Sequence, residues 1–148
     1  MHRGKQLGVI DKEGCYIQVV LGEVFGAKSE IDLLSPAFYY HIKLKADKRI
    51  DIPTDPTHNA FIYQISGALE LEANQRLKSN QVVLYQRGDS IINLYAETDA
   101  EFLVLGGQPL NEPVYSYGPF VMNDEEQIRR CIQNYNSGAM GDPELVNR

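Results

Sequence analysis

Histidine side chains are the first groups to consider for chemistry in this chain, and they are few and scattered. The 148 residues contain three of them, His2, His41 and His58. His41 falls on the polar face of a predicted strand, whereas His58 precedes a strand and is the single metal-ligand candidate. With Asp51 and Asp55 it could contribute to a surface cation site. A zinc or iron centre needs three or four protein ligands, so the sequence predicts no bound metal.

Other catalytic arrangements are also missing from the sequence. Cys15 and Cys131 stand far apart and form no CxxC pair, a usage typical of a reduced compartment and not of a disulfide framework. No Gly-x-Ser-x-Gly nucleophile motif and no glycine-rich phosphate loop occurs. Paired acids such as Asp11 and Glu13 are typical of solvated turns. We therefore expect no catalytic residues.

Composition and charge narrow the class of protein. A chain of 148 residues with 43% hydrophobic and 23% charged residues has the composition of a single globular domain with a real core. The net charge of −6 repels a phosphate backbone, which argues against nucleic acid as a partner. No run approaches the roughly 20 apolar residues of a membrane span, and no signal-peptide core follows the N-terminus. We expect a cytoplasmic protein without membrane contact.

Short strands account for most of the chain. Phe38, Tyr40, Ile42 and Leu44 alternate with more polar residues, which is the period of a half-buried strand. Similar runs, bounded by turn residues, occur at 15–21, 61–65, 69–72, 81–85, 90–95 and 101–105. Seven or more short strands at such intervals predict an all-β sandwich or barrel.

One helix is predicted near the C-terminus. Asn123 is a suitable N-cap, and Glu126 three residues later completes a capping-box pattern. Gly138 is a suitable C-terminal stop. An apolar stripe recurs between them at helical spacing, at Ile128, Cys131, Ile132 and Tyr135. We expect this stripe to pack on the outside of the barrel.

The most specific pattern is the segment GGQPLNEPVYSYGPFVMNDEEQI, which begins at Gly106. Its glycines end a strand, and its prolines enforce extended backbone. We interpret it as a connector and a helix cap in which Glu112 anchors the loop. The residues that define the motif are Gly106, Gly107, Pro109, Leu110, Glu112, Pro113, Val114, Gly118, Pro119, Phe120 and Asn123.

This motif strongly resembles the C-terminal domain of the pirin family, and the stretches 22–29 and 59–67 look like early strands of the same domain. The resemblance covers about residues 14–141, and we expect loose termini at 1–10 and 142–148. It implies one domain over residues 1–148. Its fold would be all-β, a cupin-like double-stranded β-helix, or jelly-roll barrel, with one C-terminal α-helix packed outside.

The resemblance also bears on metal binding. Pirins typically contain two cupin domains, of which the N-terminal one holds iron through three histidines and a glutamate, and this chain resembles only the second. The cupin imidazoles would fall near Pro53 and Asp55, and the carboxylate near Asn59 or Ala60, where the required groups are absent. We expect no cofactor, with iron or another transition metal present only if the chain is an enzyme.

Barrel-lining polar residues remain as pocket candidates. Tyr40, Gln64 and Asn93 have a strand phase that would point them inward, where a small molecule could bind.

Three functions follow as expectations. The first is a metal-free module with a structural, regulatory or protein-interaction role, whose partner is a second copy (a homodimer) or a metal-bearing pirin-type half. The alternative is quercetin 2,3-dioxygenase-like activity, since some pirins are similar to such enzymes. The third is small-molecule binding inside the barrel.

Overall fold

The computed structural model of this chain describes residues 7–31 and 33–141. Their contacts divide the chain into two compact units, residues 1–109 and residues 110–148. The first unit contains two main β-sheets, and the second contains a small hairpin and a helix. Each unit is described separately below.

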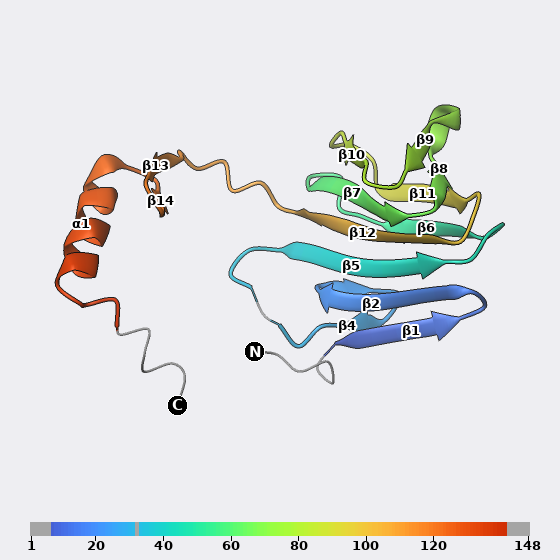
Figure 1. Cartoon of the computed structure of the whole chain (residues 1–148), viewed down its shortest axis with the longest axis horizontal. Coiled ribbons are helices and arrows are strands. Elements are labelled where there is room, and N and C mark those ends of the chain that lie inside the picture. The colour runs from blue at the N-terminus through green and yellow to red at the C-terminus, as the bar shows by residue number, and fades with distance from the viewer. Residues whose placement is uncertain (1–6, 32, 142–148) are drawn as a thin grey trace. The chain divides into compact units, whose positions relative to one another are not determined.

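The larger sheet of the first unit has six antiparallel strands in the order β1-β2-β5-β12-β7-β10 (Figure 1). A smaller sheet of four strands, in the order β6-β11-β8-β9, faces it. The larger sheet comprises β1 (Gly8–Lys12), β2 (Cys15–Leu21), β5 (Ala37–Leu44), β12 (Ala100–Gly107), β7 (Asn59–Ser66) and β10 (Val82–Tyr85). The smaller comprises β6 (Arg49–Pro53), β11 (Ile91–Ala96), β8 (Ala68–Glu70) and β9 (Arg76–Lys78). A short hairpin of β3 (Glu23–Val24) and β4 (Ala27–Lys28) and a 3-10 turn at Glu72–Asn74 complete the unit.

The core lies between the two sheets and is built from layers of inward side chains. Alternate residues of each strand point inward, so cross-strand partners on neighbouring strands stack in rows. One row joins Ile17, Ile42, Phe102 and Gln64, and the next joins Val19, Tyr40, Val104 and Ile62. Each of these side chains is at most 3% exposed. Inward residues of the smaller sheet, such as Ile52 and Leu69, belong to the same cluster. The predicted all-β, two-sheet barrel is thereby confirmed.

The N-terminal boundary differs from the prediction. Residues 8–10 were expected in a loose terminus, but they belong to β1, which pairs along its whole length with β2. The reason is the two-residue turn between the strands, in which Glu13 and Gly14 both have positive φ values of 49° and 85°. This is the backbone of the tight hairpin turn that best matches strand twist, and Glu-Gly is a weaker sequence signal for it than Asn-Gly or Asp-Gly. The predicted loose segment 142–148 lies outside the described residues.

The second unit contains β13 (Tyr115–Tyr117), β14 (Phe120–Met122) and α1 (Glu125–Asn136). The helix starts one residue later than predicted, because the Asp124 carboxylate, not Asn123, accepts the hydrogen bond from the backbone N–H of Gln127 at 2.8 Å. The helix ends as predicted before Gly138, which has a φ of 75°. The packing of α1 against the barrel stays a prediction. Within the described residues, no helix is long and apolar enough to cross a membrane.

Candidate functional site

His58, the histidine considered as a metal ligand, lies beside an aromatic cluster. Phe38 lies on β5 at the same level as Gly106 on β12, and its ring stacks on His58 with 6.5 Å between the centroids. It also stacks on Tyr40 at 5.3 Å. His58 is half-buried, with the Phe38 ring on one side and the chain of Asp55 close by, since the His58 backbone N–H donates to the Asp55 carbonyl at 3.0 Å.

The donor set does not fit a cupin metal. Across residues 7–31 and 33–141, no three His, Cys, Asp or Glu side chains converge on one point. Asp55 instead accepts hydrogen bonds from the backbone N–H and hydroxyl of Thr57, at 2.8 and 2.6 Å, which lower its pKa. Asp51 lies on the exposed side of β6. The cation site considered for Asp51, Asp55 and His58 is thus not assembled.

Of the three pocket candidates, two point inward and one does not. Tyr40 is 3% exposed, and its hydroxyl donates to the Glu23 carbonyl at 2.8 Å; burial raises its pKa to about 12, and nearby Glu23 adds to the shift. Gln64 is fully buried and donates from Nε2 to the Ser66 carbonyl at 2.6 Å, while its Oε1 has no partner. The Tyr40 hydroxyl is thus satisfied within the chain, whereas Gln64 keeps one buried amide oxygen without a partner.

Asn93 corrects the prediction for β11. It is exposed and donates to the Glu72 carboxylate at 2.7 Å. Its neighbours Ile92 and Leu94 are buried and take the inward face, because the apolar residues of an alternating strand gain most from the core.

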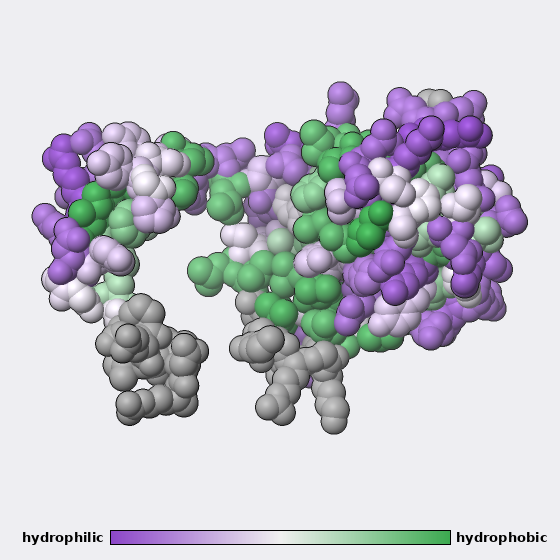
Figure 2. Space-filling view, viewed as in Figure 1, coloured by the Kyte–Doolittle hydropathy of each residue, from purple (hydrophilic) through white to green (hydrophobic). Residues whose placement is uncertain are grey.

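The outer face of the larger sheet carries a continuous apolar surface. One row across four strands consists of Tyr39, Leu105, Phe61 and Leu84, which are direct cross-strand partners. The adjacent row contains Leu103, Tyr63 and Val82. Most are half-buried, but Leu84 is 77% and Val82 53% exposed. We call these seven residues the apolar sheet face. Figure 2 shows apolar residues gathered over this part of the sheet, with hydrophilic residues towards its other end.

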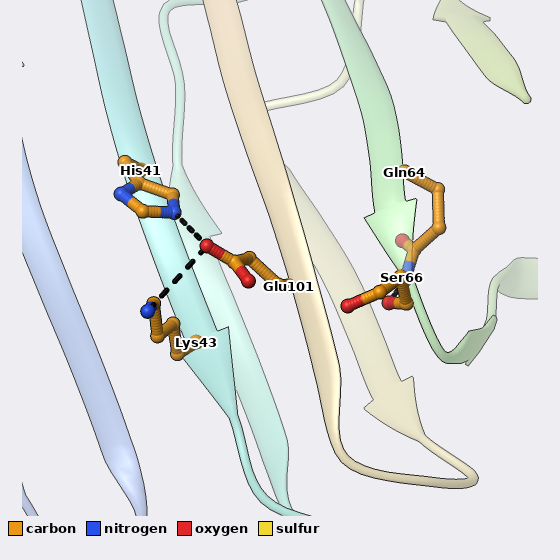
Figure 3. Close-up of polar contacts among 5 residues, drawn as sticks. All are labelled: His41, Lys43, Gln64, Ser66 and Glu101. Carbon is orange, nitrogen blue, oxygen red and sulfur yellow. Dashed lines mark hydrogen bonds and ion pairs between the residues drawn. The ribbon is translucent and has the colours of Figure 1, made fainter. Parts of the chain in front are cut away.

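A charged cluster lies on the same face, next to the apolar rows (Figure 3). The Glu101 carboxylate accepts from His41 Nε2 at 2.7 Å and lies 3.5 Å from Lys43 Nζ. The hydrogen bond from His41 is the main cause of a lowered Glu101 pKa, to which Lys43 also contributes. The same figure shows Gln64 and Ser66 on β7, apart from this cluster.

The lowered Glu101 pKa predicts a small acid sensitivity. Because the folded pKa is below the ordinary value of 4.5, the ion pair stabilises the fold above that pH, and its contribution disappears as the pH falls through the folded pKa. Glu101→Gln should cost about 0.5 kcal/mol at neutral pH, given the partial exposure. Urea unfolding between about pH 7 and pH 3 measures this. The free energy of unfolding of Glu101→Gln should fall less with acid than that of wild type. The control Glu30→Gln, at an exposed residue, should keep the pH dependence of wild type. An unchanged pH profile for Glu101→Gln would contradict this.

A cleft of about 420 Å³ opens beside the charged cluster. The β1–β2 turn and the ends of β5, β7 and β12 line it, and its polar groups include Lys43, Asp99 and Glu101. Lys45 pairs with Asp99 at 2.6 Å, so these charges largely neutralise one another. The cleft therefore shares Lys43 and Glu101 with the charged cluster and belongs to the polar end of the larger sheet's outer face.

The motif that begins at Gly106 acts as the predicted connector. A side chain on Gly106 would overlap the Phe38 ring and the Asn59 carbonyl, so the strand can approach them only as glycine. Gly118 has a φ of 55° and with Pro119 forms the two-residue turn between β13 and β14, a position that favours glycine. Pro109 and Leu110 lie at the boundary of the two units.

Glu112 anchors the loop as expected. Its carboxylate accepts a hydrogen bond from Asn123 Nδ2 at 3.0 Å, and the same amide donates to the Pro113 carbonyl at 2.9 Å. Asn123 is thus occupied with the loop, which explains why the next residue caps the helix. Phe120 packs edge-on against Tyr135 of α1, with 6.2 Å between the ring centroids.

Comparisons with known proteins agree with this architecture. Residues 39–141 match the family model of the pirin C-terminal cupin domain. The chain is 31% identical to human Pirin over 134 residues, which cover 88% of this chain and 46% of that protein. It is 30% identical to a putative quercetin 2,3-dioxygenase of Pseudomonas aeruginosa, covering 90% of this chain and 46% of that protein.

A comparison with a solved structure supports the same fold. The crystal structure of a quercetin 2,3-dioxygenase from Acinetobacter baumannii superimposes with a TM-score of 0.85 and 33% identity, over 95% of this chain and 49% of that one. The chain thus spans about half the length of the relatives it matches. With a family match over most of the barrel, the hairpin and the helix, the chain belongs to the pirin family through that family's C-terminal cupin domain.

Proposed function

We propose that this chain is a metal-free pirin-type module that acts by protein association, and that it pairs with a second copy of itself through the apolar sheet face. The observation that carries the proposal is the row from Tyr39 through Leu105 and Phe61 to Leu84, which spans four strands on the outside of the sheet. Large apolar patches on a protein surface typically mark interaction sites.

The arrangement of side chains suits a symmetric interface. Protein interfaces have an apolar centre and a polar rim, and the apolar rows here are flanked by the His41–Glu101–Lys43 cluster. A twofold pairing would place apolar rows against each other and leave the charges at the edge. A metal-bearing pirin-type half is the second candidate partner, because the relatives are about twice as long as this chain.

A single charged substitution tests the pairing. Leu84→Glu should weaken self-association about tenfold or more, because the most exposed residue of the apolar sheet face is replaced by a carboxylate that the contact would bury. The measurement is sedimentation velocity over a concentration series. The matched control is Gln86→Glu, which adds the same charge at an exposed residue just beyond β10 and should leave association unchanged. A wild-type chain that stays monomeric at about 1 mM would disprove the proposal.

The names of two relatives favour a second candidate, dioxygenase activity of the quercetinase type. Such chemistry relies on a redox metal, and the described residues do not assemble ligands for one. Metal analysis of purified protein together with a flavonol-loss assay separates the two candidates. Stoichiometric iron, copper, nickel or manganese with turnover would favour the enzyme. A cytoplasmic location also belongs to our proposal, supported by two free cysteines.

A further inference from the structure

A row of polar side chains crosses the outer face of the larger sheet inside the cleft of about 420 Å³. Its members are direct cross-strand partners on five neighbouring strands, and all of them line the cleft: Asp11, Tyr16, Lys43, Glu101 and Ser66. We call these five residues the polar row. Because neighbouring strands lie about 4.8 Å apart, the row presents one hydrogen-bonding group at each such step, over about 19 Å.

Glu101 is the acceptor of the row whose orientation is best fixed. Its Oε1 accepts from His41 Nε2 at 2.7 Å and lies 3.5 Å from Lys43 Nζ. A carboxylate has about four lone-pair sites, so Oε2 keeps its capacity for a donor in the cleft. Since His41 belongs to the next row of the face and does not line the cleft, it orients the carboxylate without filling the site.

A β-bulge lies at the Ser66 end of the polar row. Glu101 is the partner of Ser66, but Phe102 is the partner of Gln64, so Ile65 is an extra residue on β7. Nε2 of the buried Gln64 donates to the Ser66 carbonyl at 2.6 Å and so stabilises the bulge. Bulges redirect side chains and are frequent beside active sites. This bulge therefore sets the direction of Ser66 at the wall of the cleft.

The charges of the cleft favour a ligand without net charge. Each lysine lies beside a carboxylate, Lys43 near Glu101 and Lys45 near Asp99 at 2.6 Å. An anion would meet these carboxylates and that of Asp11, whereas a cation would meet the two lysines. An apolar ligand would remove water from the charges without replacing its hydrogen bonds. A hydroxyl group both donates and accepts, so a molecule with several hydroxyls satisfies all the groups of the row.

We propose that this cleft binds a small, uncharged, polyhydroxylated molecule of the carbohydrate type along the polar row. Its hydroxyls pair with Lys43, Glu101 and Ser66. The buried residues Leu44 and Ala100, which also line the cleft, meet its C–H groups. The volume of the cleft lies within the range of ligand pockets, about 300–1,000 Å³. This inference goes beyond the proposed function, since association through the apolar sheet face does not require it.

The cleft is formed by the first unit alone. Its lining residues fall between Asp11 and Glu101, and the first unit extends to Pro109. Glu101 lies at the start of β12, whereas Gly107 ends that strand, about 20 Å away at the rise of an extended chain. The regular pairing of the first unit thus ends far from the cleft, whose shape is a property of this unit.

Sugar titrations of the full chain, followed by amide NMR, test the site. One mixture contains the neutral sugars glucose, galactose, mannose, maltose and lactose. A second contains glucuronic and galacturonic acids, and a third contains glucosamine and galactosamine, with each sugar at up to about 10 mM. The neutral mixture should shift the amide signals of Lys43, Glu101 and Ser66 saturably, and more strongly than either charged mixture.

Two substitutions locate the binding in the polar row. Glu101→Gln and Lys43→Met should each weaken binding of the neutral sugars about tenfold, because each removes a charge-assisted hydrogen bond. The matched controls are Glu30→Gln and Lys78→Met, at exposed residues outside the cleft, and they should bind as wild type does. Amide signals away from the cleft report that each variant is folded.

The outcomes are specific to this site. Shifts confined to the polar row, lost in both variants and kept in both controls, support the inference. Stronger shifts with either charged mixture overturn it, as does the absence of shifts with every mixture or wild-type binding by both variants. Self-association through the apolar sheet face is measured separately by sedimentation of Leu84→Glu, so failure of one proposal does not imply failure of the other.

Discussion

Phe102→Ala is expected to destabilise the chain by about 4 kcal/mol, within the range for truncating a buried phenylalanine. Phe102 is fully buried on β12, between Ile42 on β5 and Gln64 on β7. Its removal deletes a large apolar contact and leaves a cavity between the two sheets. The cavity cannot close easily, because β12 is paired with β5 on one side and with β7 on the other. Urea unfolding followed by far-UV circular dichroism measures the loss.

The neighbouring residue provides the control for this prediction. Leu103 lies on the same strand but on the outer face, where it is only partly buried. Leu103→Ala should therefore cost about 1 kcal/mol when measured on dilute, monomeric protein. Similar losses for the two variants would mean that Phe102 does not anchor the core as the strand alternation indicates.

Gly106→Ala is expected to destabilise the chain by about 3 kcal/mol, the upper part of the range for overpacking. The added methyl group would overlap both the Phe38 ring and the Asn59 carbonyl. The ring can turn aside, but the carbonyl belongs to the backbone of β7, which pairs with β12 at this point. The same denaturation experiment reports the change.

Two further variants identify which overlap matters. Phe38→Leu in the Gly106→Ala background should recover only part of the stability, because the Asn59 carbonyl remains. Gly107→Ala should cost less than Gly106→Ala, since its methyl group would meet the nearest atom, the Pro36 carbonyl oxygen, at 2.9 Å. Complete recovery by Phe38→Leu would place the whole conflict in the ring and not in the strand pairing.

The second of these predictions concerns the end of the barrel at Gly106. Phe38 fills that end and stacks on His58, while Gly106 leaves the room that the ring needs. The missing side chain at Gly106 and the position of the Phe38 ring thus depend on each other.

Local patterns in the sequence predicted much of the fold. The alternation from Phe38 to Leu44 indicated a half-buried strand, and β5 has this face pattern. The segment from Gly106 to Asn123 indicated the family and the connector. The helix was predicted within one residue. Asn123 and Asp124 are equally good caps, and the long-range contact of Asn123 with Glu112 decided between them.

What the sequence by itself determined is the set of strands, the capped helix and the family, because these depend on residues close together along the chain. The tertiary structure alone decided which strands are neighbours. Tyr39, Phe61, Leu84 and Leu105 come from four separate strands, and the partner of His41 is 60 residues away. A period of two shows that residues share a face, but the sheet order that joins faces into a surface arises from pairing between distant segments.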